Sequence, residues 1–328
     1  MLFLSRNWFL FCLPLSVGLA FFFPTVGAAH GWLQSQSTTK IAVVCIFLLQ
    51  GLTLPSSTLR KGLTDWRLHL LVQGVTFLAF PLIGIGLNQL LGRFLPPDLA
   101  LGFLYLCVLP STISSSVGLT GVAGGNTVGA LFNAVLSNVL GVFITPLWIA
   151  WLLRREGTSQ PLGPLFIEIL SLLLAPLILG QLLRLRLSRF MDGRKKIAAN
   201  LASGCILYLV FAAFCNSVQS KLWTLQGPSV LALASAGVLL LFVIVAGLTE
   251  VASRLLKLNR ADHLAAAFCA PQKTLASGLP MAKIIFDGHP AFGLIVLPVL
   301  IYHPLQLFVC GILAVRWGRL SAESKSSE

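Results

Sequence analysis

Apolar runs of about 20 residues follow one another along nearly the whole chain, separated by short polar stretches. An α-helix needs about 20 apolar residues to cross the hydrocarbon core of a bilayer. The pattern therefore predicts ten membrane-spanning helices and no soluble domain. The first run also has the charge and length of a signal peptide, but its pattern recurs later in the chain, and we expect it to remain as a helix. The predicted helices cover approximately residues 8–23, 40–58, 68–91, 99–123, 127–153, 163–185, 197–217, 229–256, 261–286 and 290–316.

Composition strengthens the membrane assignment. Hydrophobic residues make up 56% of the chain and charged residues only 10%, whereas soluble domains carry about 25% charged residues. The formal net charge of +13 matches cationic loops facing an anionic leaflet, so we expect the lipid bilayer and no nucleic acid as a partner. The seven cysteines lie inside apolar segments without metal-binding spacing, which predicts no metal site. Motifs of hydrolases, nucleotide-binding loops and zinc peptidases are missing from the sequence, and we expect no enzyme.

Four short motifs recur at offsets of 158 to 163 residues. This near-constant spacing indicates a duplicated unit of five helices, at about residues 7–155 and 163–317. Because five is odd, the second copy enters the membrane from the opposite side. The sequence thus predicts an all-α fold of two inverted five-helix repeats in a single polytopic domain over residues 1–328. The matching pairs are Pro14–Gly18 with Pro176–Gly180, Leu109–Thr112 with Ala270–Lys273, Gly125 and Asn126 with Gly288 and His289, and Thr145–Leu147 with His303–Leu305.

The distribution of basic residues predicts the orientation of these helices. Sixteen Lys and Arg residues fall on the side of the N-terminus and six on the other side, six of the sixteen lying in the 184–196 loop. Cytoplasmic loops carry the excess of Lys and Arg. We therefore expect a multi-pass protein of the cell (inner or plasma) membrane with both termini in the cytoplasm.

The fourth and ninth segments contain the candidate binding site. Each has a proline, Pro110 or Pro271, beside clustered polar residues. Proline removes a backbone donor, so we expect both helices to be interrupted and to cross near the bilayer midplane, where half-helix N-termini favour an anion and freed carbonyls favour a cation. Packing of kinked helices is the alternative explanation. The candidate binding residues here are Thr112, Ser114, Ser115, Ser116, Cys269, Gln272, Lys273 and Thr274.

Lys273 lies about twelve residues into its segment. A charge at that depth is costly in lipid, so its side chain must face protein or water. Asn126, Asn133 and Ser137 complete the candidate substrate- or ion-binding set. Lys273 and His303 are the candidates for carrying a proton, although a histidine bonded to a neighbouring carbonyl is the commoner arrangement.

Several motifs resemble the sodium/bile-acid cotransporter superfamily, and within it the "cotransporter 7" type, over about residues 5–318. They are Val44–Leu54, Gly124–Asn126, Leu131–Asn133, Gly141–Pro146, Gly278–Phe286 and Ile301–Pro304. The resemblance implies ten helices, with a panel domain formed by helices 1, 2, 6 and 7 and a core domain formed by helices 3–5 and 8–10. It also implies that helices 4 and 9 cross at the site.

In the bile-acid-transporting branch, sodium ions bind at this crossover through a Ser-Asn pair, an acidic residue and a glutamine. By position, Ser115 and Ser116 correspond to the pair, Cys269 to the acid and Lys273 to the glutamine. The resemblance therefore allows a sodium ion at Ser115 and Ser116, and no other cofactor. An ammonium at Lys273 would repel a neighbouring cation, which argues against sodium coupling.

The expected function is secondary active transport of a small organic anion by alternating access. The substrate class is bile-acid-like or steroid-conjugate-like, or another carboxylate or sulfate. Sodium symport, proton coupling and sodium-independent transport remain open at this stage. A non-transporting membrane regulator of calcium homeostasis is the second hypothesis, and the sequence leaves the oligomeric state open.

Overall fold

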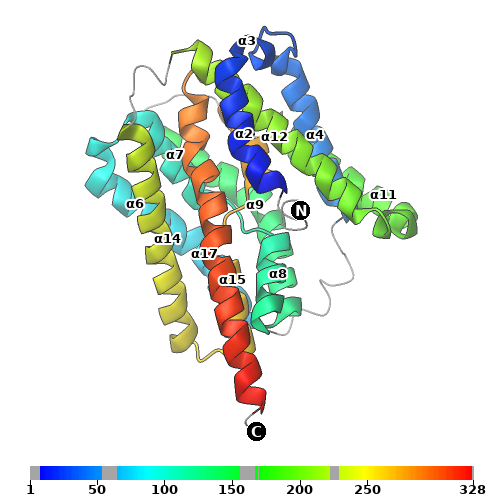
Figure 1. Cartoon of the computed structure of the whole chain (residues 1–328), viewed down its shortest axis with the longest axis vertical. Coiled ribbons are helices and arrows are strands. Elements are labelled where there is room, and N and C mark those ends of the chain that lie inside the picture. The colour runs from blue at the N-terminus through cyan, green and yellow to red at the C-terminus, as the bar shows by residue number, and fades with distance from the viewer. Residues whose placement is uncertain (1–7, 54–64, 156–166, 169, 222–228, 327–328) are drawn as a thin grey trace. The chain divides into compact units, whose positions relative to one another are not determined.

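The computed structural model describes residues 8–53, 65–155, 167–168, 170–221 and 229–326, and every regular element in these ranges is helical (Figure 1). Six of these helical stretches are long and apolar enough to cross a membrane, which confirms an all-helical membrane protein. They are Ser35–Thr53, Trp66–Phe94, Thr127–Leu152, Lys195–Gln219, Ser229–Leu255 and Phe292–Arg319, and shorter apolar helices cover Phe11–Phe22, Pro97–Val108 and Leu275–Ile285. The number of spans and the inverted repeat remain predictions. The predicted ends at 54–58 and 163–166 lie outside the described residues.

Backbone contacts divide the chain into two compact units. Unit 1 consists of residues 1–54, 150–231 and 276–297, and unit 2 consists of residues 55–149, 232–275 and 298–328.

Unit 1 contains the helices of the first two and the sixth and seventh predicted segments, together with α16 (Leu275–Ile285), the second half of the ninth. The α4 helix packs against α11 and α12, and α2 also packs against α12 (Figure 1). Gly51 and Gly180 let α4 and α11 approach closely, because a Cβ atom at either position would clash with the backbone of the other helix. Its main elements are α2 (Trp8–Phe22), α3 (Pro24–Gly27), α4 (Ser35–Thr53), the π-helix η4 (Leu170–Leu174), α11 (Ala175–Asp192) and α12 (Lys195–Gln219).

Two side chains of α11 donate hydrogen bonds to backbone carbonyls in the last described turn of α4. Gln181 donates a hydrogen bond of 2.6 Å to the Gly51 carbonyl, and Arg184 donates one of 2.7 Å to the Leu52 carbonyl. These bonds join the last described turn of α4 to α11. Gln181 therefore has the interhelical role that is common for polar residues in membrane helices.

Unit 2 holds the predicted crossover. The α6 helix packs against α7, and α15 packs against α8 and α5. The ring of Tyr302, fully buried, lies between Phe80 and Phe242 at centroid distances of 6.1 and 5.9 Å. Elements within or entering unit 2 are α5 (Trp66–Gly74), the π-helix η2 (Val75–Ala79), α6 (Phe80–Leu91), η3 (Gly92–Phe94), α7 (Pro97–Val108), α8 (Ser114–Ala123), α9 (Thr127–Arg155), α14 (Ser229–Leu255), α15 (Arg260–Cys269) and α17 (Phe292–Ser326).

Candidate functional site: two interrupted helices around a buried lysine

Both predicted helix interruptions are present. The fourth segment is split into α7 and α8 by residues 109–113, and the ninth into α15 and α16 by residues 270–274. Leu109, which precedes Pro110, is extended (φ −70°, ψ 151°), as the steric effect of a following proline favours. The Thr274 N–H donates to the Pro110 carbonyl at 2.9 Å, so the two breaks touch each other within unit 2.

The Lys273 side chain ends in a cage of backbone carbonyls. Its Nζ atom donates to the carbonyl oxygens of Leu109 at 2.7 Å, Cys107 at 2.9 Å and Thr76 at 3.0 Å. It also lies 4.0 Å from the centroid of the Phe80 ring. An ammonium has three N–H donors, and the cage uses all three. With 1% of its surface exposed, Lys273 faces protein, as its depth in the segment predicted.

Each carbonyl in the cage has lost its intrahelical partner. Cys107 and Leu109 lie where α7 ends, and the last carbonyls of a helix are unpaired. Thr76 lies in the π-helix η2, where the partner of its carbonyl would be the N–H of residue 81, which is a proline. Pro81 also leaves the Phe77 carbonyl free, and this oxygen accepts a hydrogen bond of 3.0 Å from the Trp148 indole.

Three hydroxyls of the first break converge on one amide oxygen. Thr112, Ser115 and Ser116 lie 2.5, 2.8 and 3.0 Å from Oε1 of Gln272. Thr112 Oγ1 also lies 2.5 Å from the Ser115 hydroxyl and 2.9 Å from the Ser116 hydroxyl. An amide oxygen has two lone pairs, so the three hydroxyl hydrogens cannot all point to it, and the cluster can rearrange its hydrogen bonds. Nε2 of Gln272 is buried without a partner among the described residues.

The start of α8 faces this hydroxyl cluster. Its N-cap residue, Ile113, provides no side-chain hydrogen bond, so the first N–H groups of the helix remain uncapped. Ser114 is exposed and Ser115 is half-buried, whereas Ser116 is fully buried. The cluster therefore runs from the half-buried Ser115 into the interior of unit 2, with the positive end of a helix beside it.

Side chains of the α9 helix hydrogen-bond to the backbone at and beside the first break, residues 109–113. Ser137 accepts a hydrogen bond of 2.9 Å from the Ser111 N–H, and Asn138 donates one of 2.8 Å to the Ser111 carbonyl. Thr145 donates to the Val108 carbonyl at 2.7 Å. Ser137 thus contacts the interrupted segment as expected, while Asn138 and Thr145 were not singled out from the sequence.

Asn133 and Asn126 make other contacts. Asn133 bonds to His69 at 2.9 Å and receives Gln73 Nε2 at 3.2 Å, so it joins α9 to α5 and has no recorded bond to the hydroxyl cluster. Asn126 bridges Asp262 at 2.7 Å and Asp65 at 3.2 Å. The structure therefore does not bring these two candidates to the two breaks.

Cys269 and His303 contact the second break through the backbone. The Cys269 carbonyl accepts a hydrogen bond of 2.6 Å from the Ser111 hydroxyl, and its buried thiol lies 3.7 Å from the Ala130 carbonyl. His303 Nδ1 lies 3.2 Å from the amide nitrogen of Gln306. Gln306 in turn bonds both backbone groups of Lys273, each at 2.8 Å. His303 therefore connects to the Lys273 backbone through Gln306.

Comparison with known proteins gives the family. The model of the SBF-like CPA transporter family matches residues 7–319. The chain belongs to this family. Its relatives include "Uncharacterized protein PA2026" of Pseudomonas aeruginosa, 37% identical over 97% of this chain and 94% of the relative. "Putative symporter YfeH" of Escherichia coli is 35% identical over 94% of this chain and 93% of the relative. "Sodium/bile acid cotransporter 7" of Rattus norvegicus is 30% identical over 94% of this chain and 91% of the relative.

This membership confirms the resemblance read from the sequence. The family is one of transporters and not of enzymes. A multi-pass protein of such a family works in a lipid bilayer and acts on a transported solute.

Proposed function

We propose that the protein is a secondary transporter that moves a small organic anion by alternating access, with Lys273 as a built-in cation in place of a coupling sodium ion. The carbonyl cage around the Lys273 ammonium is the observation that supports this most directly. Backbone carbonyl oxygens at the ends of interrupted helices are the groups with which transporters coordinate sodium.

A sodium ion beside this ammonium would be unfavourable. Two unit charges 4 Å apart repel by about 4 kcal/mol at an effective dielectric constant of 20. The described groups around Nζ are carbonyls and an aromatic ring, none of them a carboxylate that would offset a second positive charge. Cys269, at the position of the acidic residue in the sodium-dependent branch, is a buried cysteine and supplies no carboxylate.

The substrate in this proposal is an anion because N–H and O–H donors lie beside a buried lysine. The uncapped start of α8 offers N–H donors, and the exposed hydroxyl of Ser114 offers an O–H donor. A carboxylate or sulfate, bile-acid-like or steroid-conjugate-like, has the acceptors that these groups require.

Alternating access is proposed to arise from the two units. The first, second, sixth and seventh predicted helices fall in unit 1, and most residues of the other predicted helices fall in unit 2, which supports a panel domain and a core domain. Residues 276–297, the second half of the ninth helix and the start of the tenth, group with unit 1. The two interrupted segments support the inverted repeat, because each occupies the fourth place in one five-helix half.

Uptake into proteoliposomes tests the proposal. Purified protein should accumulate radiolabelled taurocholate or a steroid sulfate at the same rate in sodium and in choline medium, with empty liposomes as the control. A strong stimulation by sodium would overturn the built-in cation. Uptake driven by an inward proton gradient would make the cycle proton-coupled, and no uptake of any anion would favour a non-transporting regulator.

A further inference from the structure

Exposed basic and apolar side chains alternate where α11 ends and α12 begins, both in unit 1 (Figure 1). Every side chain that the structure describes between residues 185 and 197 is exposed. The large apolar members, Leu185, Phe190 and Ile197, leave 75, 55 and 64% of their surfaces uncovered. The cationic members are Arg186, Arg194, Lys195 and Lys196, and together these seven residues form the α11–α12 patch.

Arg184 marks the point at which α11 leaves the packed part of unit 1. Its side chain is buried and bonds to the Leu52 carbonyl of α4. Beyond it, none of the described side chains of α11 is buried. Arg194 turns back to this exposed end, because its guanidinium carbon lies 3.7 Å from the centroid of the Phe190 ring. A cation and an apolar ring are thereby held in one surface.

The composition of the α11–α12 patch matches the surface of an anionic bilayer. Large exposed apolar side chains bordered by polar residues mark interaction sites. Apolar side chains that alternate with Lys and Arg suit the boundary between acyl chains and headgroups, where the apolar groups enter the hydrocarbon and the cations reach phosphates.

The charges around the patch favour an anionic partner. Residues 181–200 contain six Lys and Arg residues and one acidic residue, Asp192. Lys195 and Lys196 occupy the first turn of α12, which has no acidic residue. The helix dipole makes cations at this end unfavourable unless an anion lies nearby.

From these observations we propose that the α11–α12 patch binds anionic phospholipid. Its cations contact headgroup phosphates, and Leu185, Phe190 and Ile197 lie among the upper parts of the acyl chains. The inference involves neither the crossover nor a transported solute, so it does not depend on the proposed function. The number of basic residues in the loops predicts an orientation of the chain, and the patch adds a preference for one class of lipid.

Orientation alone is the competing explanation for these basic residues. Cytoplasmic loops are rich in Lys and Arg whether or not they bind a particular lipid. In that case the purified protein would not distinguish anionic from zwitterionic phospholipid. Direct binding predicts that it does, and that salt weakens the preference by screening the charges.

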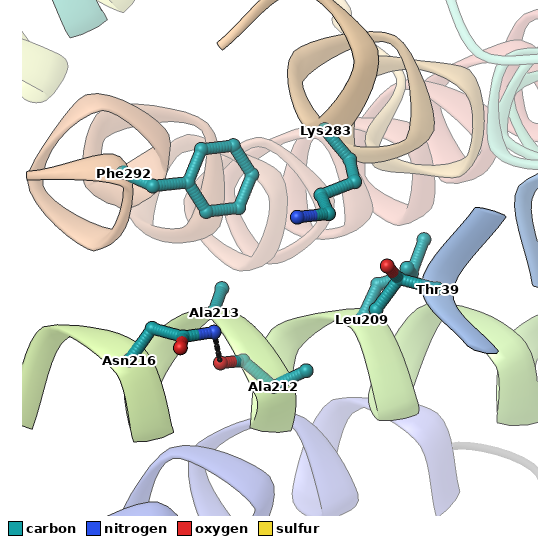
Figure 2. Close-up of a pocket in the computed structure, with 7 residues that line it drawn as sticks. All are labelled: Thr39, Leu209, Ala212, Ala213, Asn216, Lys283 and Phe292. Carbon is teal, nitrogen blue, oxygen red and sulfur yellow. Dashed lines mark hydrogen bonds between the residues drawn. The ribbon is translucent and has the colours of Figure 1, made fainter. Parts of the chain in front are cut away.

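Two lysines elsewhere in unit 1 provide matched controls. Lys221 is exposed and follows the far end of α12, whose 25 residues span about 37 Å. Lys283 is only 17% exposed and pairs with Asp287 at 2.6 Å. Figure 2 shows the Lys283 side chain extending towards α12, with Phe292 beside it. The cavity there has a volume of about 10 Å³, which leaves no room for a headgroup.

The test measures, by native mass spectrometry, the binding of dioleoyl-phosphatidylglycerol and dioleoyl-phosphatidylcholine to the purified full-length protein. Wild type should bind the anionic lipid at least about tenfold more tightly. Arg186→Gln, Arg194→Gln and Lys196→Gln should each weaken this binding about two- to fivefold and leave phosphatidylcholine binding unchanged. The double variant Arg194→Gln/Lys196→Gln should lose most of the preference, whereas Lys221→Gln and Lys283→Gln should keep it.

Three further measurements identify the bound group and check the fold. Raising ammonium acetate from 50 to 500 mM should weaken only phosphatidylglycerol binding. Glycerol 3-phosphate, which has the phosphate without acyl chains, should not displace the lipid. Each variant should unfold at the wild-type temperature in phosphatidylcholine micelles, because the altered side chains are exposed.

Several outcomes would overturn the proposal. They are equal binding of the two lipids by wild type, an unchanged preference in the double variant, or an equal loss in Lys221→Gln. Displacement of the lipid by glycerol 3-phosphate would indicate a site for free phosphate instead. Binding of polyglutamate without any preference between the lipids would indicate an acidic protein as the partner.

Discussion

Replacement of Lys273 by glutamine removes the ammonium from its cage and keeps a polar side chain. In the native protein Nζ satisfies the carbonyls of Leu109, Cys107 and Thr76. A glutamine amide has two N–H donors, so at least one of these buried carbonyls loses its partner. An unpaired buried acceptor costs about 1–3 kcal/mol.

Two further effects act in opposite directions. Loss of the positive charge at the carboxyl end of α7 costs about 0.3–1 kcal/mol, while a neutral side chain no longer has to be desolvated as an ion, which is favourable. We therefore expect Lys273→Gln to lower the free energy of unfolding by about 1–3 kcal/mol. Arg316→Gln, which removes an exposed charge from α17, serves as the matched control.

Thermal unfolding in detergent, in sodium chloride and in choline chloride, measures both stability and cation binding. The wild-type midpoint should be the same in the two salts. The Lys273→Gln midpoint should be lower in choline and should partly recover in sodium, because a sodium ion can occupy the vacated oxygens. Adding Cys269→Glu should enlarge the sodium effect by supplying a carboxylate. An unchanged midpoint in Lys273→Gln, or equal stabilisation of wild type by sodium, would refute the reasoning.

Three other predictions test the crossover, the topology and the packing of unit 1. Ser115→Leu should abolish anion uptake while leaving expression intact, since it disrupts the hydroxyl cluster at Gln272; uptake at the wild-type rate would reduce the cluster to a packing role. Gly193→Cys, at a position with open space around it, should react with an impermeant thiol reagent only from the cytoplasmic side, and labelling from outside would reverse the predicted orientation. Gly51→Val should destabilise the protein by about 1–3 kcal/mol in thermal unfolding, because its side chain would overlap the backbone of α11; an unchanged midpoint would mean that the helices separate easily.

The interruptions of the two helices could be predicted because their cause is local. Pro110 and Pro271 lack a backbone donor, and each lies beside polar residues that can pair with freed carbonyls. The predicted segments 99–123 and 261–286 match the paired helices α7 with α8 and α15 with α16 to within two residues at each outer end. Hydrophobic length and proline position were sufficient for this part of the fold.

The partners of the polar side chains could not be predicted in the same way. Asn126 and Asn133 follow the interrupted fourth helix in sequence, yet their hydrogen bonds go to Asp262 and His69. These contacts depend on how distant helices pack, and no periodicity in a single segment carries that information. Gln306 also bonds across helices, and its partner is the backbone of Lys273, 33 residues earlier in the chain.

Pro81 shows where a stronger prediction was available. A proline inside a span leaves upstream carbonyls without a donor, so the sequence alone implied unpaired acceptors near Thr76 and Phe77. It also contained Lys273, a buried donor that needed acceptors. The sequence could not show that the Lys273 ammonium contacts the Thr76 carbonyl, because the two residues are 197 positions apart in the chain. The Lys273 side chain is thus stabilised by backbone carbonyls of other helices that have no partner within their own helix. This explains how a lysine can lie inside a membrane protein without a carboxylate beside it.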